Sequence, residues 1–402
     1  MIGTTPFHPR TEAANRTGLW GHWAGYLAAE KYQLSEKAEY FLIRNSAGLF
    51  DTSPLYKYRV TGAEAERFLA GVLTRDIRHC HPGHAQYTVW CDDDGHVIED
   101  GIVMRLADDE FFLTSARPNL AYFRGLVGRL EVEVTDVTAD QAALAVQGPR
   151  SRRLLTKLGD GTAELDYFGV AKSEAAGISV TESRTGFTGD LGYEIWAPAD
   201  EALALWDAVT EAAEGEGAGP VGQQALLMAR IEAGLVLIDV DYRSARFAWT
   251  HNERSTPSEL GLDWMLRDLG DDRPFVGRRA LQLEADRNTT RRRLAGLIVD
   301  WEDWDARHVE AGLIPAKDHR PVHQEMMVYS GGDPVGWASS FMYSPILQRH
   351  IALARVRPDL AVPGNRVGLE VTIDHAYHTV GAVVTRLPFY APAHRTGRGD
   401  VP

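Results

Sequence analysis

Length, composition and charge limit the classes of protein that this chain can be. It has 402 residues, of which 44% are hydrophobic and 24% charged, enough for roughly two or three domains with cores of their own. Its 42 basic and 56 acidic residues give a formal net charge of −14, which repels nucleic acids and anionic membranes overall. With two cysteines, no disulfide framework, no apolar leader and no long apolar stretch, we expect a soluble, cytoplasmic protein without a nucleic-acid or membrane partner.

The first third of the sequence predicts alternating helices and strands. Apolar residues recur at helical spacing in some segments and alternate with polar residues in others. An Asp- and Gly-rich turn between two alternating runs is typical of a β-hairpin. The expected elements are a helix over 36–49 that ends near Gly48, a strand over 49–62, a helix over 63–74, a hairpin over 85–106, a strand over 111–116 and a helix over 119–130.

The remaining two thirds divide into a mixed part and a β-rich part. Residues 130–198 are rich in strand patterns, and two helices are predicted at roughly 200–213 and 220–234. The charged segment 267–296 is typical of a linker. Beyond it, glycines and prolines separate short alternating runs, which predicts an all-β C-terminal domain. The last ten residues have the composition of a frayed tail.

The segment His79-Cys80-His81-Pro-Gly-His84 brings together side chains that bind zinc in other proteins. A second pair of ligands is missing, because Cys91 has no nearby cysteine or histidine partner in the sequence. The same segment also fits a turn that leads into a strand. We therefore predict no metal ion, and a zinc module remains the alternative.

Sequence signatures of nucleophilic catalysis and of phosphate binding are absent. There is no Gly-x-Ser-x-Gly elbow, and neither cysteine has an activating context. Residues 183–195, SRTGFTGDLGYEI, contain three glycines within seven positions, but no Gly-Lys-Ser/Thr follows them. We expect these glycines to let the backbone bend tightly and approach a flat ligand.

Glu194 is the most informative polar residue of that segment. It lies inside an apolar strand pattern, GYEIWAP, where a carboxylate is costly unless it meets hydrogen-bond donors. A folate pterin presents a ring N–H and an amino group side by side, which a carboxylate accepts as a pair. The residues alone leave a second interpretation open, an exposed glutamate on an edge strand.

Motifs along nearly the whole chain resemble the glycine-cleavage T-protein (aminomethyltransferase) superfamily. They follow the family's order, and it is this order, more than any single motif, that carries the resemblance. The matching stretches are AGLFDTS (47–53), TRDIRHCHPGHAQYTVW (74–90), GHVIEDGIV (95–103), LAVQGPRSRRLL (144–155), GFTGDLGYEIWAP (186–198), MARIEAGL (228–235), RPFVGRRAL (273–281), VGWASSFMYSPILQRHIALARV (335–356) and PFY (388–390).

The resemblance implies a three-lobed, ring-like α+β fold with a central channel that holds tetrahydrofolate, and a C-terminal β-barrel. Members of the superfamily move a one-carbon unit between a substrate heteroatom and folate. The implied domains are a discontinuous folate-binding domain 1 (1–60 and 135–235), a domain 2 (61–134 and 236–285) and the barrel domain (290–402).

The resemblance also implies roles for single residues. Asp100 matches the family's essential acid near the reacting nitrogens of folate, and Glu194 matches the carboxylate that binds the pterin. Arg230 matches the family's arginine in its LRLEAG segment. Phe187 stands where the family has a tyrosine, so a phenolic hydroxyl is missing. Further residues expected to line the folate site are Tyr167, Trp264 and Tyr87.

The chain departs from the glycine-cleavage enzyme where that enzyme reads approximately LYGHEL. Here the segment is Ile238-Asp-Val-Asp-Tyr242, so the substrate side of the site is altered. If the substrate is an aryl ether, the departing phenolate needs a proton, and we expect Tyr242 to supply it as the general acid. We expect Tyr26 and His22, from the aromatic segment 20–26, to contribute to the substrate site.

Further aromatic residues suit an aromatic or apolar substrate, although each could equally pack a domain interface. Trp249 is predicted to bind substrate, and Trp301, Trp304, Trp337 and Tyr343 add to the aromatic content. The chain therefore resembles more closely the tetrahydrofolate-dependent demethylases of the superfamily, which implies removal of a methyl or methylene group from a small, aromatic ether. The alternatives are a true aminomethyltransferase working with a lipoyl carrier protein, a sulfonium or N-methyl demethylase, and a folate-binding protein without turnover.

Overall fold

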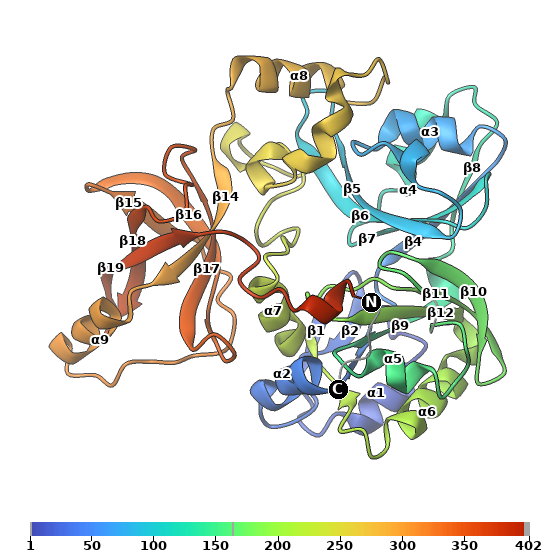
Figure 1. Ribbon diagram of the computed structural model, residues 1–402, viewed down its shortest axis with the longest axis horizontal. Coiled ribbons are helices and arrows are strands. Elements are labelled where there is room, and N and C mark those ends of the chain that lie inside the picture. Colours follow the sequence, from blue (N-terminus) through green and yellow to red (C-terminus); the bar gives the residue numbers. More distant parts are fainter. Residues whose placement is uncertain (1, 163–164, 398–402) are drawn as a thin grey trace.

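The computed structural model describes residues 2–162 and 165–397, and three lobes are visible around the helix α7 (Gln223–Glu232). Two of the lobes are built on open β-sheets, and the third is a closed barrel (Figure 1). Among the described residues, no helix has the length and apolar character needed to cross a membrane.

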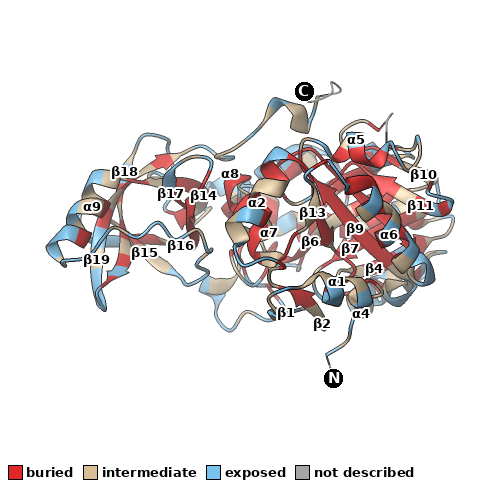
Figure 2. Ribbon diagram, turned by 90° about the horizontal axis from the view of Figure 1, so that it is seen from below, coloured by how far each residue is buried: buried red, intermediate tan, exposed pale blue. Residues whose placement is uncertain are grey.

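The first lobe contains a six-stranded sheet in the order β10-β11-β12-β9-β3-β13. Its central strands are almost fully buried and alternate apolar side chains against the helices (Figure 2). The strands are β3 (Gly48–Asp51), β9 (Gln141–Gln147), β10 (Val170–Ala175), β11 (Ile178–Ser183), β12 (Gly192–Pro198) and β13 (Gly219–Pro220). The other elements of this lobe are α1 (His8–Ala14), the hairpin β1 (Trp20–Trp23) and β2 (Tyr26–Ala29), α2 (Glu36–Asn45), α5 (Ser151–Leu155), α6 (Ala202–Ala213) and α7.

The second lobe contains a five-stranded sheet in the order β5-β6-β7-β4-β8. The predicted hairpin is confirmed, because β5 and β6 pair antiparallel on either side of the Asp-rich turn. The elements are β4 (Tyr56–Thr61), α3 (Ala65–Val72), β5 (His84–Cys91), β6 (Val97–Arg105), β7 (Glu110–Ser115), α4 (Leu120–Val127), β8 (Glu133–Asp136) and α8 (Arg278–Arg287).

The two sheets pack against each other through one apolar cluster. Met104 and Phe112 of the second sheet meet Ala143 and Trp196 of the first, and the rings of Phe112 and Trp196 lie 5.4 Å apart. Burial of this contact orients the strands β6 and β12 relative to each other. These are the strands that carry Asp100 and Glu194.

The third lobe is the closed six-stranded barrel that the sequence predicts, and the expected α+β fold class is confirmed. Its elements are β14 (Arg293–Val299), α9 (Trp301–Glu310), β15 (Met326–Ser330), β16 (Asp333–Ser344), β17 (Arg349–Val356), β18 (Arg366–Ile373) and β19 (Ala376–Thr385). The helix α9 was not expected in an all-β domain. Asp300 begins it by accepting hydrogen bonds from the backbone N–H groups of Glu302 and Asp303.

Short 3₁₀ helices complete the structure. They lie at Ile77–His79, Thr138–Asp140, Ala199–Glu201, His251–Glu253, Ser258–Leu260, Asp263–Gly270 and Ala393–Arg395.

Two predictions near the start of the chain are wrong in detail. The helix over 36–49 stops at Asn45, and Gly48 begins a strand instead of ending the helix. The single strand over 49–62 is two strands, β3 and β4, which lie in different sheets. The turn between them includes Pro54, which interrupts a strand because it lacks an N–H. The boundary expected at residue 60 falls inside β4.

The prediction of a linker over residues 267–296 is also wrong. Arg273 is buried and donates hydrogen bonds to the carbonyl oxygens of Leu73, at 2.9 Å, and Thr74, at 2.6 Å. Leu281 of α8 is buried as well, so the charged segment is packed against the rest of the protein.

The strand β10 was not predicted from the sequence, because its outward-facing polar residues weaken the alternating pattern.

The expected frayed tail is ordered over its first half. His394 lies 2.7 Å from Asp190, and the guanidinium of Arg184 donates to the carbonyl oxygens of Arg395 and Gly397, at 3.1 and 2.6 Å. Residues 398–402 of the predicted tail lie outside the described residues. The C-terminal segment therefore returns from the barrel and is fastened to the first lobe (Figure 1).

Candidate active site

A cavity of about 1610 Å³ lies between the lobes and is lined by both sheets, by the loop that follows α7 and by the segment that leaves the barrel. We call it the central cavity. Asp100 of β6 and Glu194 of β12 both line it. The sequence separates these two acids by 94 residues, and the packing of the two sheets brings them to one cavity.

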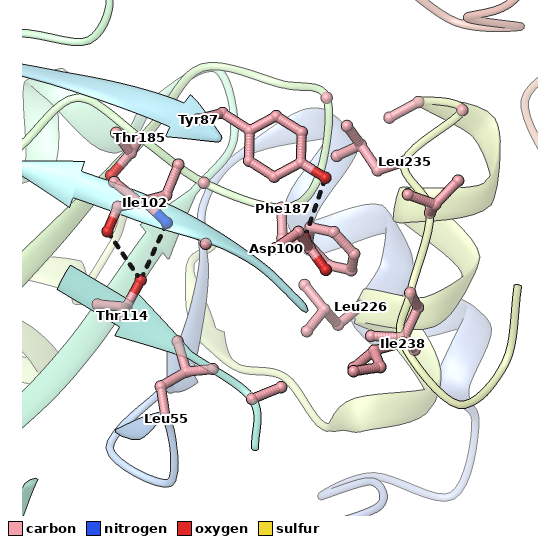
Figure 3. Close-up of a pocket in the computed structure, with 18 of the residues that line it drawn as sticks. Leu55, Tyr87, Asp100, Ile102, Thr114, Thr185, Phe187, Leu226, Leu235 and Ile238 are labelled. Atoms are coloured by element: carbon pink, nitrogen blue, oxygen red, sulfur yellow. Dashed lines mark hydrogen bonds between the residues drawn. The ribbon is translucent and has the colours of Figure 1, made fainter. Parts of the chain in front are cut away.

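Asp100 is held by two phenolic hydroxyl groups. Tyr87 donates a hydrogen bond to its Oδ2 at 3.0 Å from the neighbouring strand β5 (Figure 3). Tyr242 donates to its Oδ1 from the loop after α7. Burial raises the pKa of Asp100, and the two hydroxyl donors oppose that rise because they stabilise the carboxylate. The result is a carboxylate oriented on two sides.

The loop over residues 237–242 places Tyr242, and Asp241 organises that loop. The Asp241 carboxylate accepts hydrogen bonds from the backbone N–H of Leu237, at 2.8 Å, and from the hydroxyl groups of Ser339 and Ser340 of β16, at 2.6 and 2.7 Å. Arg230 of α7 donates to the same carboxylate at 2.5 Å. The loop is thereby tied to α7 and to the barrel.

Arg230 does not reach the central cavity. Its guanidinium is fully buried, and besides Asp241 it donates to Ser340 Oγ at 2.7 Å and to the Leu235 carbonyl oxygen at 3.2 Å. The structure thus places this arginine outside the lining of the central cavity, and its expected role in folate binding stays a prediction. Its partner Asp241, which the sequence reasoning gave no role, explains why the positive charge is turned away from the cavity.

Glu194 lies in the central strand β12, so the alternative of an exposed edge-strand glutamate is excluded. Its side chain is buried, and burial raises its pKa. The Thr185 hydroxyl donates a hydrogen bond to Oε2 of Glu194. Among the described residues, it is the one hydrogen-bond donor to this carboxylate. An ionised carboxylate accepts more than one donor, so Glu194 retains accepting capacity toward the cavity.

The glycines over 185–192 approach protein atoms closely. A Cβ at Gly186 or Gly192 would lie 2.0 or 2.2 Å from Oε1 of Gln147, and a Cβ at Gly189 would lie 2.4 Å from the Cβ of Ala233. Gln147 in turn donates to the Thr185 carbonyl oxygen at 3.1 Å. The glycines therefore let this turn close around Gln147. Sequence reasoning missed Gln147, although it lies in the matching stretch LAVQGP.

Most of the remaining predicted site residues also line the central cavity. Tyr167 accepts a hydrogen bond from Arg395 at 2.9 Å, and the guanidinium of Arg75 lies 5.2 Å from the ring of Trp264. The predicted residues in the lining are Asp100, Glu194, Tyr87, Phe187, Tyr167, Trp264 and His22. Tyr242 stands directly behind Asp100.

Besides Tyr242, three predicted residues are not in the lining. They are Arg230, Tyr26 and Trp249. Trp249 is 86% exposed on the surface. The sequence does not reveal this, because a single aromatic residue in a loop gives no indication of where its side chain points. Tyr26 pairs in β2 with Trp23, which does line the cavity together with His22. The aromatic residues Trp301, Trp304, Trp337 and Tyr343 belong to the barrel and are not part of the lining.

The segment from His79 to His84 forms a turn. Cys80 is buried and its thiol contacts the His84 carbonyl oxygen at 3.4 Å. His79 comes near Asp76 and Asp268, and Asp76 is already paired with Arg78 at 2.7 Å. The four residues of the predicted zinc alternative are not gathered around one point in the described part of the chain.

Two sheets and a barrel that enclose a large cavity with two buried acids define an α+β protein with an internal small-molecule site. The sequence matches the GCVT N-terminal domain over residues 8–268 and the glycine cleavage T-protein C-terminal barrel domain over residues 310–391. The chain therefore belongs to the glycine cleavage T-protein family, as the motifs indicate.

Relatives agree with this assignment, and a solved structure has the same fold. The chain is 33% identical to an aminomethyltransferase of Streptomyces coelicolor over 89% of this chain and 90% of the relative. It is 34% identical to an aminomethyltransferase of Mycolicibacterium paratuberculosis over 92% and 93% of the two chains. The crystal structure of the glycine cleavage system aminomethyltransferase T from Bartonella henselae has the same fold, with a TM-score of 0.82, 24% identity and coverage of 97% and 99%.

Proposed function

We propose that this protein is a tetrahydrofolate-dependent one-carbon transferase, which removes a methyl or methylene group from a small aromatic ether and passes it to N5 of folate. Membership of the T-protein family supports tetrahydrofolate as the acceptor. When bound, tetrahydrofolate supplies the nucleophilic nitrogen that receives the one-carbon unit. The residues of this chain would bind and orient folate and the donor and would place a charged group beside the reacting atoms.

The central cavity fits a pterin at Glu194. The carboxylate is buried at the cavity wall with one hydroxyl donor from the described residues, and such a group is costly unless further donors reach it. The N–H and amino groups of a pterin edge are donors of the required kind. Phe187 lines the same cavity and offers a ring face without a hydroxyl group.

Asp100 is proposed as the acid at the reacting end. A fixed carboxylate stabilises positive charge that develops on a nearby amine, and Tyr87 and Tyr242 fix this one on two sides. The Tyr242 hydroxyl therefore donates its hydrogen bond to Asp100. Burial raises the pKa of Tyr242 well above its ordinary value. We assign Tyr242 the role of positioning Asp100, because its proton reaches a leaving oxygen only through that carboxylate.

The size of the central cavity is the observation that carries the proposal. Sites for one drug-sized ligand measure about 300–1,000 Å³, and this one measures about 1610 Å³, so it has room for folate and a second small reactant together. Near the β1–β2 hairpin and α7, the wall contains several apolar side chains. Its residues there include Trp23, Phe50, Leu55, Leu226 and Leu227, which suit an aromatic donor.

The test is to incubate the protein with tetrahydrofolate and panels of aryl methyl ethers, methylenedioxy compounds, sulfonium compounds and methylamines. Identification of the folate product by mass distinguishes 5-methyl from 5,10-methylene tetrahydrofolate. We expect turnover with an aromatic ether and loss of turnover in Asp100→Asn with folate binding retained. Saturable folate binding without turnover of any donor would make the protein a folate-binding protein instead.

A glycine-cleavage aminomethyltransferase is the second candidate, and the names of the 30–34% identical relatives favour it. That reaction needs a lipoyl carrier protein as the donor of the aminomethyl group. Release of ammonia and formation of 5,10-methylene tetrahydrofolate only in the presence of an aminomethylated carrier would establish it. Activity on a free aromatic ether without carrier would exclude it as the principal reaction.

A further inference from the structure

Lys57 is a buried lysine bonded to the turn between β3 and β4, residues 52–55, which we call the β3–β4 turn. The residue is fully buried. Its Nζ donates hydrogen bonds to the carbonyl oxygens of Ser53, at 2.7 Å, and Leu55, at 2.9 Å. Burial lowers the pKa of Lys57 to about 8, and the charge of Asp51 opposes the fall. A buried charge is costly unless hydrogen bonds compensate it, and here the two carbonyl oxygens of the turn do so.

Asp51, the last residue of β3, holds the other end of the turn. Its Oδ1 accepts a hydrogen bond from the backbone N–H of Ser53 at 2.9 Å, and its Oδ2 accepts one from the Thr5 hydroxyl at 2.6 Å. Burial raises the pKa of Asp51, and these hydrogen bonds and the charge of Lys57 oppose the rise. Because β3 belongs to the first sheet and β4 to the second, the two charged residues hold the chain where it passes from one lobe to the other.

The β3–β4 turn forms part of the wall of the central cavity. Thr52, Leu55 and the adjoining Tyr56 line the cavity, and Leu55 extends from the turn into it (Figure 3). Burial and then the charge of Tyr26 raise the pKa of Tyr56, so this part of the wall lies near the β1–β2 hairpin. In the proposed function the pterin occupies the wall at β12, and the donor is expected at the hairpin.

The two ends of the turn are fixed by different groups. At its start, the Thr52 N–H donates to the carbonyl oxygen of Ala143 in β9 at 2.9 Å. The Leu55 N–H donates back to the Thr52 carbonyl oxygen at 3.1 Å, and Pro54 has no N–H to donate. The start is therefore attached to the first sheet, whereas the carbonyl oxygen of Leu55 is held by Lys57.

We propose that Lys57 is a positioning residue for the one-carbon donor, because it fixes the β3–β4 turn and with it the surface of Leu55 and Tyr56 against which the donor packs. The inference rests on the proposed function and assigns this part of the wall to the donor. Lys57 is not in the lining, so it acts through the turn. Without its ammonium two buried carbonyl oxygens lose their donor, and the turn opens more often.

The test is Lys57→Met, which keeps a buried hydrocarbon chain and removes the donors. Hydrogen–deuterium exchange of the free protein should become at least about tenfold faster over residues 50–57, because hydrogen bonds from a charged group are lost. Exchange in β12 should not change. With the donor found in the ether panel, the KM for the donor should rise at least about tenfold, while kcat changes less than about threefold and the KM for tetrahydrofolate stays the same.

This division between the kinetic constants distinguishes positioning from a purely structural role. A structural role would lower the fraction of active protein, and therefore kcat, without changing either KM. Lys57→Gln keeps N–H donors on a shorter side chain and should give a donor KM between those of Lys57→Met and the native protein. It carries the test if Lys57→Met fails to fold. The matched control is Lys172→Met, which removes an exposed lysine of β10 and should match the native protein in every measurement.

Two results would overturn the inference. One is native exchange over residues 50–57 in Lys57→Met, and the other is a rise of the KM values for donor and folate together. The exchange measurement and a folate titration need no donor, so faster exchange with native folate affinity supports the inference even in a protein that turns over no ether. Conversely, turnover of an ether by Lys57→Met with the native donor KM would support the proposed function and refute the positioning role.

Discussion

The hydroxyl of Tyr242 donates a hydrogen bond to Asp100 across 142 residues of sequence, and this contact joins the loop after α7 to the hairpin β5–β6. On its other side, the loop is bound through Asp241 to α7 and to β16. The orientation of Asp100 thus depends on all three lobes. A change in any of them is transmitted to Asp100 through a chain of buried hydrogen bonds.

Replacement Tyr242→Phe should raise the pKa of Asp100, because it removes a donor that stabilises the carboxylate. The acidic limb of the profile of kcat/KM against pH should therefore move to higher pH, and kcat should fall about 10- to 100-fold at neutral pH through lost orientation. Stopped assays across pH 5–9 with the donor found in the ether panel would measure both.

The control for this prediction is Tyr377→Phe, an exposed tyrosine of the barrel, which should behave as the native protein. Tyr87→Phe should move the acidic limb in the same direction as Tyr242→Phe. A profile unchanged by both substitutions would show that Asp100 is not the group that titrates in the reaction.

Replacement Glu194→Gln should weaken tetrahydrofolate binding by about 10- to 100-fold, because a hydrogen bond to a charged group is worth roughly 1.5–3 kcal/mol. The folded protein should not lose stability, since burial of the ionised carboxylate is itself unfavourable. Equilibrium titration of folate and a thermal melt of the free protein would measure the two effects. The exposed Glu302→Gln on α9 is the control, and equal folate affinity in all three proteins would remove Glu194 from the site.

The sequence allows the two acids to be predicted but not all of their partners. Asp100 and Glu194 lie in motifs whose order along the chain resembles one family, and an acid within an apolar strand is conspicuous. Arg230 also lies in such a motif, but the sequence does not show that its guanidinium points toward Asp241 and away from the central cavity. Gln147 and Thr185 were missed since a buried amide and a hydroxyl have no distinctive pattern.

Predictions of the fold succeeded where local pattern and tertiary structure agree. The hairpin β5–β6 and the helices α6 and α7 have regular periodicity and appear as expected. The charged composition of residues 267–296 was misleading, because Arg273 is buried and donates hydrogen bonds to the carbonyl oxygens of Ala70 in α3 and of Leu73 and Thr74 after it. Tryptophans misled as well. Trp249 is exposed and Trp304 packs in the barrel, and composition alone cannot distinguish these environments from a binding site.

Replacement Glu232→Gln should destabilise the protein by about 3–5 kcal/mol, the usual result of removing one partner of a buried ion pair. Glu232 of α7 accepts from Arg44 at 2.7 Å, from Tyr40 at 2.8 Å and from Ser344 at 2.5 Å, and the first pair is fully buried. The substitution would leave the Arg44 charge undercompensated. Urea unfolding at neutral pH measures the change, with Asp359→Asn on the exposed barrel pair as the control. Equal midpoints for Glu232→Gln and the native protein would contradict the prediction.

His350 should make the folding stability of the protein depend on pH below neutrality. Its ring is buried in the barrel, stacked on Phe341 with centroids 5.4 Å apart and close to Trp304 at 4.1 Å. Burial, and then the nearby charges of His308, His319 and Lys317, lower its pKa to about 4 from 6.5. The unfolded chain therefore binds a proton between these values that the folded chain does not. Stability is lost as pH falls from 6.5 toward 4, by about 2 kcal/mol at pH 5.

The variant His350→Phe keeps a ring in the stack and removes the titrating group. Its unfolding free energy should fall less steeply between pH 7 and pH 5 than that of the native protein, and the difference between the two slopes isolates His350 from the other titrating groups. Urea unfolding at both pH values measures the slopes. Parallel dependences would mean that the folded protein admits the proton, for which the stacked ring would have to leave Phe341 and reach water.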